Sequence, residues 1–286
     1  MVIATAFNDS LITPFSIEDG LELKMNESSY EFLLLEQSEN FVATITLNRP
    51  KKLNTFNTTM AHELHDALIR LDSEKEVNVM VIKGAGEAFC AGIDVKELEG
   101  KSALEYREWV EAMELPLLCI AKLKKPVIAQ VHGVAAANGM GLVAAADLAI
   151  AADNARMGLT AINVGLNCVG PVVPVSKSVG RKKALELLFY GDLIHADEAL
   201  RLGLINKISP ANQIDVECRK WAVALAQKSP IAIQIAKKSF YTSEDMNYEK
   251  QFEFMSEAFA RLCTTEDAKE GVKAFLEKRK PTWRYR

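Results

Sequence analysis

Short apolar strands alternate with helical segments between residues 41 and 155. Strands are predicted where apolar residues alternate with threonine or run without interruption, at 42–47, 77–82, 126–131 and 148–152. The spacing of apolar residues between them predicts a helix capped by Thr58 or Thr59 and ending near Leu71, a charged helical region over 96–122, and a short helix of small residues over 139–146. This alternation is typical of an α/β domain with a largely parallel sheet.

The chain becomes mainly helical beyond about residue 155. Helices are predicted over 181–190 and 196–202, from Pro230 onward, and over 244–263 and 266–280. Gly191 and Gly203 stand just after two of these segments, where glycine commonly ends a helix. We therefore expect three parts: a loosely ordered extension over 1–29, a core over 30–210 and a C-terminal helical region over 211–286.

Composition excludes several classes of protein. A chain of 286 residues that is 49% hydrophobic and 25% charged suits one large globular domain, and its net charge of −4 does not favour nucleic-acid binding. Its five cysteines are scattered without metal-ligand spacing, so we expect no metal site, no disulfide framework and a reducing, cytoplasmic location. Residues 1–29 carry acidic residues but no arginine, which argues against a mitochondrial transit peptide, and no apolar run reaches transmembrane length.

Two segments rich in small residues follow predicted strands. One is Phe89-Cys90-Ala91-Gly92-Ile93-Asp94, and the other runs from Val131 to Asp147 and contains Asn138-Gly139-Met140-Gly141. Small residues at such turns let a ligand approach the backbone closely. Two turns of this kind can direct two backbone N–H groups at one oxygen, which is how enzymes stabilise a developing oxyanion. The pattern predicts a site that binds and activates an acyl group.

These two segments belong to a series of five motifs. The others are the strand 42–50, the Gly-Asp-Leu-Ile-His-Ala-Asp-Glu-Ala run 191–199 and the Phe-Leu-Glu-Lys-Arg-Lys-Pro run 275–281. In this order, over about residues 30 to 281, they resemble the enoyl-CoA hydratase/isomerase (crotonase) superfamily. The resemblance implies a spiral of ββα turns with a C-terminal helical region, and a homotrimer or dimer of trimers. It also implies an acyl-CoA substrate, with coenzyme A as part of that substrate and no permanently bound cofactor.

The resemblance also assigns residues to roles. The backbone N–H groups of Ile93 and Asn138 would hold the thioester oxygen, at the start of the helix that begins near Gly139. The coenzyme A arm would pass Lys52, Leu53 and the Ala91–Lys96 turn, with Phe275 and Lys278 near its nucleotide end. From this turn we expect Ala91, Gly92, Asp94 and Lys96 to contribute to substrate binding, together with Gly139 of the second segment. The alternative for Lys52 and Lys278 is an ordinary solvated amine.

Carboxylates expected by the resemblance are absent. Family hydratases use two glutamates, and motif alignment places Gly141 and Ala161 at those positions, with Val169 at a third acidic position of some other members. Each missing acid or base costs a factor on the order of 100 to 10,000 in rate. We therefore expect hydration of enoyl thioesters to be weak or absent. An acyl-CoA decarboxylase, a double-bond isomerase and a non-catalytic acyl-CoA-binding protein remain as alternatives.

Particular subgroups share part of the pattern. The run 160–166 resembles methylmalonyl-CoA decarboxylase-like members, but those carry a histidine where this chain has Ile93. The Asn-Val-Gly-Leu run 163–166 and the ending 278–283 resemble the enoyl-CoA hydratase domain-containing proteins. The Gly84-Ala85-Gly86 run lacks the third glycine of a dinucleotide fingerprint.

Several other side chains are interpreted mainly as structural. The Asn138 amide either contacts substrate or only caps its helix, and Asp94 either contributes to binding or holds its turn. The remaining candidates are Cys90 and Cys168 as core thiols, His132 as a hydrogen-bonded structural histidine, Asp147 as a brace for backbone, and the basic tail 279–286 as a solvated segment or subunit contact.

Overall fold

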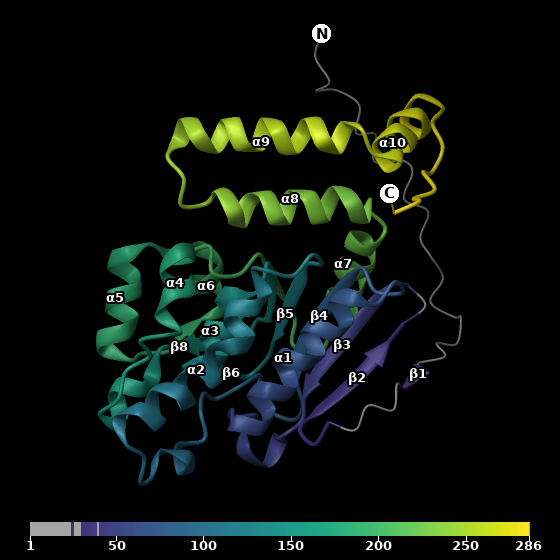
Figure 1. Cartoon of the computed structure of the whole chain (residues 1–286). Helices are drawn as coiled ribbons and strands as arrows, with labels where there is room; N and C mark the ends of the chain where they lie inside the picture. Colours follow the sequence, from purple (N-terminus) through teal and green to yellow (C-terminus); the bar gives the residue numbers. More distant parts are fainter. Residues whose placement is uncertain (1–23, 26–29, 39, 286) are drawn as a thin grey trace.

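A computed structural model describes residues 24–25, 30–38 and 40–285. Its main sheet has seven strands in the order β1-β2-β3-β4-β5-β7-β10. The first three pair in antiparallel fashion, and β3 to β10 pair in parallel. Their bounds are β1 Lys24–Met25, β2 Leu33–Gln37, β3 Val42–Leu47, β4 Val79–Gly84, β5 Val127–Val131, β7 Leu148–Ala152 and β10 Lys207–Ser209. Figure 1 shows these strands in the lower half of the molecule.

A smaller sheet lies beside the first. It contains β6 (Val134–Ala136), β8 (Arg156–Gly158) and β9 (Ile194–His195), with β8 in the centre. The strands β5 and β7 of the main sheet are each followed by a strand of the small one, β6 and β8, and then by helix. After β4 the same place is taken by a single parallel bridge between Cys90 and Ala135. This succession is the ββα spiral expected from the sequence.

Helices cover both faces of the main sheet. On one face α1 (Thr58–Ser73) and α3 (Asn138–Ala145) pack on the strands, and α2 (Ala103–Ile120) packs on α1 and α3; all three share one core with Met80 and Ile82. On the opposite face, α7 (Ile214–Ala226) packs its Cys218, Ala222 and Ala226 against Val79 and Val81. Because side chains alternate along a strand, uninterrupted apolar strands bury both of their faces. The parallel character predicted from these runs is confirmed.

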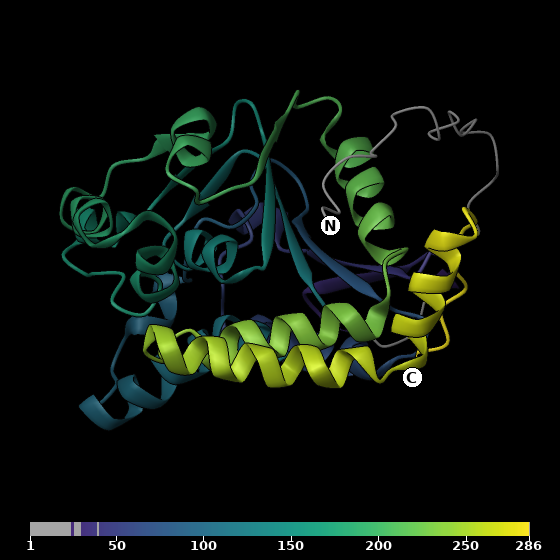
Figure 2. The same cartoon turned by 90° about the horizontal axis from the view of Figure 1, so that it is seen from above.

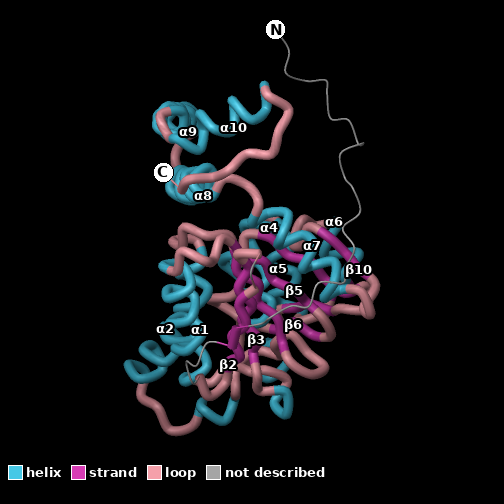
Figure 3. Tube along the Cα trace, turned by 90° about the vertical axis from the view of Figure 1, so that its right-hand side faces the viewer, coloured by secondary structure: helices cyan, strands magenta, loops and turns pink. Residues whose placement is uncertain are grey.

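The C-terminal helices form a layer above the sheet. Figures 1 and 2 show α8 (Pro230–Ser243) and α9 (Tyr248–Cys263) side by side, with α10 (Glu266–Leu276) crossing near their end. In the side view of Figure 3 this layer stands apart from the strands. The tail returns to it: Asp267 accepts hydrogen bonds from Ser229 and from the backbone N–H groups of Arg284 and Tyr285. The remaining helices are α4 (Val172–Val179), α5 (Arg181–Tyr190), α6 (Ala196–Arg201) and the 3-10 turns η2 (Pro50–Lys52), η3 (Val95–Leu98) and η4 (Thr160–Val164).

Most predicted elements are found, with two informative differences. Gly191 and Gly203 adopt the positive φ expected after a helix, and Ser229 caps α8 by accepting a hydrogen bond from the N–H of Ala232. The predicted cap of α1 is wrong, because Asn57 rather than a threonine accepts from Met60 N. The helical region predicted over 96–122 is confirmed, but it divides into η3 and α2, because Ser102 and Glu105 form a capping box that starts a new helix.

The N-terminal extension predicted over 1–29 lies outside the described residues, except for the short strand β1 that pairs with β2. Within the described residues, no helix combines the length and apolar character needed to cross a bilayer.

Candidate active site

The two small-residue turns pack directly against each other. A Cβ added to Gly139 would lie 2.1 Å from the carbonyl oxygen of Cys90, and one added to Gly92 would lie 3.1 Å from the Cβ of Ala137. Gly92 also has a φ of 112°, which side-chain-bearing residues rarely adopt. The glycines therefore serve contact between the two turns, a reason that the sequence pattern alone did not reveal.

This packing leaves two backbone donors without a protein acceptor. Phe56 N donates to Gly92 O at 2.8 Å and Asp94 N donates to Phe56 O at 2.6 Å, so the intervening Ile93 N–H points to the other side. Asn138 is the first residue of α3, where a helix has no acceptor of its own for the N–H. Among the described residues neither N–H makes a backbone hydrogen bond.

The residue before α3 is held in an unusual conformation. Ala137 has φ 50° and ψ −115°, a combination sparsely populated by residues other than glycine. Its N–H donates to Gly158 O at 2.8 Å, and the neighbouring Ala136 N donates to Cys90 O at 2.9 Å. Backbone strain of this kind costs on the order of 1–3 kcal/mol and persists where the surrounding contacts fix it. Here those contacts fix the direction of the Asn138 N–H.

Ile93 and Asn138 line one cavity of about 500 Å³. Its volume lies in the range of roughly 300–1,000 Å³ typical of small-molecule sites. The walls are largely apolar and come from η3, α2, the start of α3 and the segment between η4 and α4. The other lining residues are Leu98, Tyr106, Trp109, Val110, Met113, Glu114, Ala137, Ala161, Leu166, Asn167, Cys168, Val169, Gly170 and Pro171. Ile93 and Asn138, the two residues predicted to hold the thioester oxygen, are more than 40 positions apart in the sequence and lie in the same cavity wall.

Asn138 and Cys168 have mainly structural side chains. The Asn138 amide donates to Met113 O at 3.3 Å, which ties α3 to α2. Cys168 lines the cavity, but burial raises the pKa of its thiol, so it is a poor nucleophile at neutral pH. Burial likewise raises the pKa of Cys90, to about 12. These observations agree with core roles for both cysteines.

The loop predicted to guide coenzyme A lies beside the first turn. Ala91 N donates to Leu53 O at 2.9 Å, which joins η2 to the segment carrying Gly92 and Ile93. Lys52 and Lys96 are exposed at this edge. Asp94 accepts from Lys96 N and forms an ion pair with Arg49 at 2.9 Å, and this hydrogen bond from Arg49 lowers the pKa of the Asp94 carboxyl. The side chain of Asp94 therefore holds the turn.

The other residues singled out in the sequence do not line the cavity beside Ile93. Phe275 lies at the end of α10 and Lys278 two residues beyond that helix. Neither lines the cavity, and Figure 1 shows α10 at the far end of the C-terminal layer from α2. His132 Nε2 lies 3.0 Å from Gly86 O and Asp147 accepts from Val127 N, as expected of structural residues. In the described part of the chain, no three or more His, Cys, Asp or Glu side chains gather as a metal site would require.

Most of the chain matches one family of known proteins. Residues 37–286 match the family model described as enoyl-CoA hydratase/isomerase. The chain belongs to the enoyl-CoA hydratase/isomerase family. It is 32% identical over 248 residues to the mitochondrial enoyl-CoA hydratase domain-containing protein 3 of Rattus norvegicus, covering 86% of this chain and 83% of that protein. It is 33% identical over 254 residues to the crotonyl-CoA hydratase of Syntrophomonas wolfei, covering 88% and 97%.

Solved structures of the family agree. The enoyl-CoA hydratase of Mycobacterium smegmatis superimposes with a TM-score of 0.85 at 38% identity, covering 88% of this chain and 98% of that one. Human enoyl-CoA hydratase domain-containing protein 3 gives 0.85 at 33% identity, covering 88% and 100%. The crotonase fold and the likeness to the domain-containing proteins, both expected from the sequence, are confirmed.

Gly141, Ala161 and Val169, which align with carboxylates of family members, have different surroundings in the structure. Ala161 and Val169 line the cavity. Gly141 does not: a Cβ there would lie 2.8 Å from both Leu117 Cδ2 and Pro171 Cβ. The space beside Gly141 is thus occupied by apolar side chains from α2 and from the residue before α4, and a larger residue at 141 would displace them.

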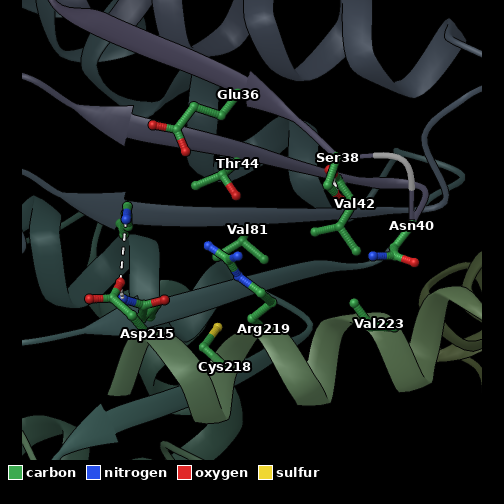
Figure 4. Close-up of a pocket in the computed structure, with 12 residues that line it drawn as sticks. Glu36, Ser38, Asn40, Val42, Thr44, Val81, Asp215, Cys218, Arg219 and Val223 are labelled. Atoms are coloured by element: carbon green, nitrogen blue, oxygen red, sulfur yellow. Dashed lines mark hydrogen bonds and ion pairs between the residues drawn. The ribbon is translucent and has the colours of Figure 1, made fainter. Parts of the chain in front are cut away.

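A second hollow lies on the opposite face of the main sheet. Figure 4 shows Glu36 and Thr44 on the strands facing Asp215, Cys218 and Arg219 of α7. Asp215 is bound there by Gln130 and Lys83, at 2.8 and 3.3 Å. The volume of about 70 Å³ is far below that of the cavity beside Ile93 and too small for an acyl chain. Of these two hollows, only the cavity beside Ile93 has room for an acyl chain.

Proposed function

We propose that the chain binds acyl-CoA thioesters and stabilises a thioester enolate with the backbone N–H groups of Ile93 and Asn138. One observation supports the proposal: Ile93 and Asn138, whose N–H groups have no backbone acceptor among the described residues, line the same largely apolar cavity. Donors fixed by the backbone need no rearrangement as negative charge develops, and each is worth about 3–4 kcal/mol in the transition state. The dipole of α3 adds positive potential at Asn138.

The proposal extends to coenzyme A. Lys52, Leu53 and Lys96 stand at the edge nearest Ile93, where exposed amines suit phosphate groups. Phe275 and Lys278 lie apart from the cavity of their own chain, so they would contact the nucleotide end from a neighbouring subunit. This requires the homotrimer or dimer of trimers that the sequence led us to expect. Exposed apolar residues on α9, Phe252 and Phe259, favour such an assembly.

We further propose that crotonyl-CoA hydration is weak or absent. Gly141 and Ala161 provide no titratable group, and the space at Gly141 is already filled by Leu117 and Pro171. Water addition needs groups that position water and exchange protons at two carbons. An oxyanion hole without that pair suits reactions that make or protonate an enolate, so isomerisation of a double bond or decarboxylation is the second candidate.

The experiment combines binding and turnover. Calorimetric titration with butyryl-CoA should show saturable binding that free coenzyme A only partly reproduces, and crotonyl-CoA should be hydrated far below the typical enzymatic 10 s⁻¹ or so. A panel of malonyl-type and 3-enoyl thioesters then separates decarboxylation from isomerisation. Absence of thioester binding contradicts the proposed function. Binding without any turnover identifies a non-catalytic acyl-CoA-binding protein.

A cytoplasmic location is the remaining part of the proposal, and it rests on the scattered cysteines, which suit a reducing compartment. The rat and human relatives named enoyl-CoA hydratase domain-containing protein 3 carry the word mitochondrial. Fractionation of cells that produce the full chain decides between the two compartments.

A further inference from the structure

The wall of the cavity formed by α2 carries an unpaired carboxylate. Glu114 is half-buried and lines the same cavity as Ile93 and Asn138. Across the described residues it has no hydrogen-bond or ion-pair partner, and its oxygens are not among the fully buried side-chain atoms that lack one. An unpaired carboxylate beside an apolar space is costly unless another group uses it.

Every other polar side chain with a comparable position is bound within the protein. Tyr106 donates its hydroxyl to Leu98 O, and Trp109 donates Nε1 to Glu97 at 2.9 Å. Asn138 donates to Met113 O, and Asn167 accepts from Cys168 N at 2.8 Å. Cys168 stays a neutral thiol because burial raises its pKa. Glu114 is therefore the one lining residue that carries an ionisable carboxyl and lacks a protein partner within the described chain.

A glycine makes the space for this carboxylate. A Cβ built on Gly170 would lie 1.7 Å from Glu114 Oε1 and 2.5 Å from its Cδ. The carboxyl group thus rests against the backbone of Gly170, on the wall that leads into α4. Gly170 does not have a positive φ, so its backbone conformation does not require glycine. Glycine is needed there because the Glu114 carboxyl group lies so close.

The surroundings of Glu114 suit proton exchange. Burial raises the pKa of Glu114, and the nearby Glu111 raises it further. A carboxyl whose pKa is raised toward the working pH is both a better base and a better acid than a solvated one. The raised pKa adds to two geometric observations: Glu114 lines the cavity, and it has no partner among the described residues.

We propose that Glu114 is a catalytic residue, the acid–base group that exchanges a proton with the α-carbon of the bound thioester. The assignment rests on the proposed function. The carboxylate takes the α-proton, the C–H electron pair forms a bond between the α-carbon and the thioester carbon, and the carbonyl π electrons move to the oxygen held by Ile93 and Asn138. Return of the proton from Glu114 to the α-carbon, or to the γ-carbon of a 3-enoyl thioester, completes the step without another reactant.

The test is exchange of the α-protons of butyryl-CoA in deuterium oxide, followed by mass spectrometry or NMR. Glu114→Gln should slow exchange by a factor on the order of 100 to 10,000 while butyryl-CoA still binds. Gly170→Ala pushes the carboxylate aside without removing it, and displacements near 1 Å cost about 100-fold. Glu108→Gln removes an exposed carboxylate of the same helix and should exchange as the wild type does.

The outcomes separate the two proposals. Failure of the wild type to bind butyryl-CoA would overturn the proposed function and this assignment with it. Binding by the wild type without exchange, or equal exchange by the wild type and Glu114→Gln, overturns the assignment alone. A second readout supports a chemical role: wild-type exchange should rise with pH through an acidic-side transition above the ordinary glutamate range, and Glu114→Gln should lose this transition.

Discussion

Lys237 of α8 donates a hydrogen bond of 2.6 Å to Asp147, which directly precedes β7. Lys237 is buried and Asp147 is half-buried, and Asp147 also accepts from Val127 N and from Tyr241 OH, at 2.7 and 2.9 Å. Lys237 further donates to Lys125 O at 2.8 Å. The pair therefore fastens the C-terminal helical layer to the sheet next to α3 and to the proposed site.

Removal of one member of this pair should be strongly destabilising. Lys237→Ala leaves the largely enclosed Asp147 carboxylate without its cation, and breaking a buried pair in this way typically costs about 3–5 kcal/mol. The free energy of unfolding in urea measures the loss. Lys238→Ala, an exposed neighbour on α8, is the matched control and should stay within about 0.5 kcal/mol of the wild type. Similar stabilities for the two variants would contradict the role assigned to Lys237.

The contact between the two turns makes a second prediction. Gly139→Ala places a methyl group 2.1 Å from Cys90 O unless the turns separate. Because that separation moves the Asn138 N–H away from Ile93, acyl-CoA affinity should fall at least about tenfold, or 1.4 kcal/mol. Titration calorimetry with butyryl-CoA measures it.

Gly271→Ala is the control for Gly139→Ala. Its Cβ meets Trp283 at an ordinary 3.4 Å, and alanine favours helix over glycine, so binding should not change. Retained affinity in Gly139→Ala would show that the two turns do not present the donors as proposed.

Introducing carboxylates at positions 141 and 161 tests the two positions separately. Gly141→Glu should fold poorly, because Leu117 and Pro171 already stand 2.8 Å from the first added atom, and overpacking typically costs about 1–3 kcal/mol or more. Ala161→Glu lines the cavity and should fold with near wild-type stability. Thermal unfolding compares the variants, and crotonyl-CoA hydration shows whether either gains activity. A stable Gly141→Glu protein with hydratase activity would contradict the packing argument.

Local signals predicted the fold better than the site. The alternation of strands and helices, the glycines at 191 and 203 and the Ser229-Pro230 start depend on neighbouring residues, so the sequence contained them. The space beside Gly141 is filled in part by Pro171, 30 residues away, so this packing could not be predicted from the residues next to Gly141 in the sequence. Glu114 was missed for the same reason: its position on α2 is ordinary, and only the approach of Gly170 makes it distinctive.

Asp94 should make the stability of the protein depend on pH. The hydrogen bond from Arg49 lowers the pKa of the folded carboxyl below that of the unfolded chain, about 3.9. The stabilisation is therefore complete above the unfolded pKa and is lost as pH falls through the folded pKa. Asp94→Asn should lower the free energy of unfolding at pH 7, and its difference from the wild type should shrink below about pH 4.

Urea unfolding of Asp94→Asn and the wild type between pH 7 and pH 3 measures this dependence. Glu108→Gln again serves as the control, since no ion pair or hydrogen bond is found for Glu108 among the described residues. Because charge-assisted hydrogen bonds contribute roughly 1.5–3 kcal/mol, the effect at pH 7 is large enough to resolve. A difference that grows on acidification would have the wrong sign for a lowered pKa, and the ion pair between Arg49 and Asp94 would then have no part in holding the turn that carries Ile93.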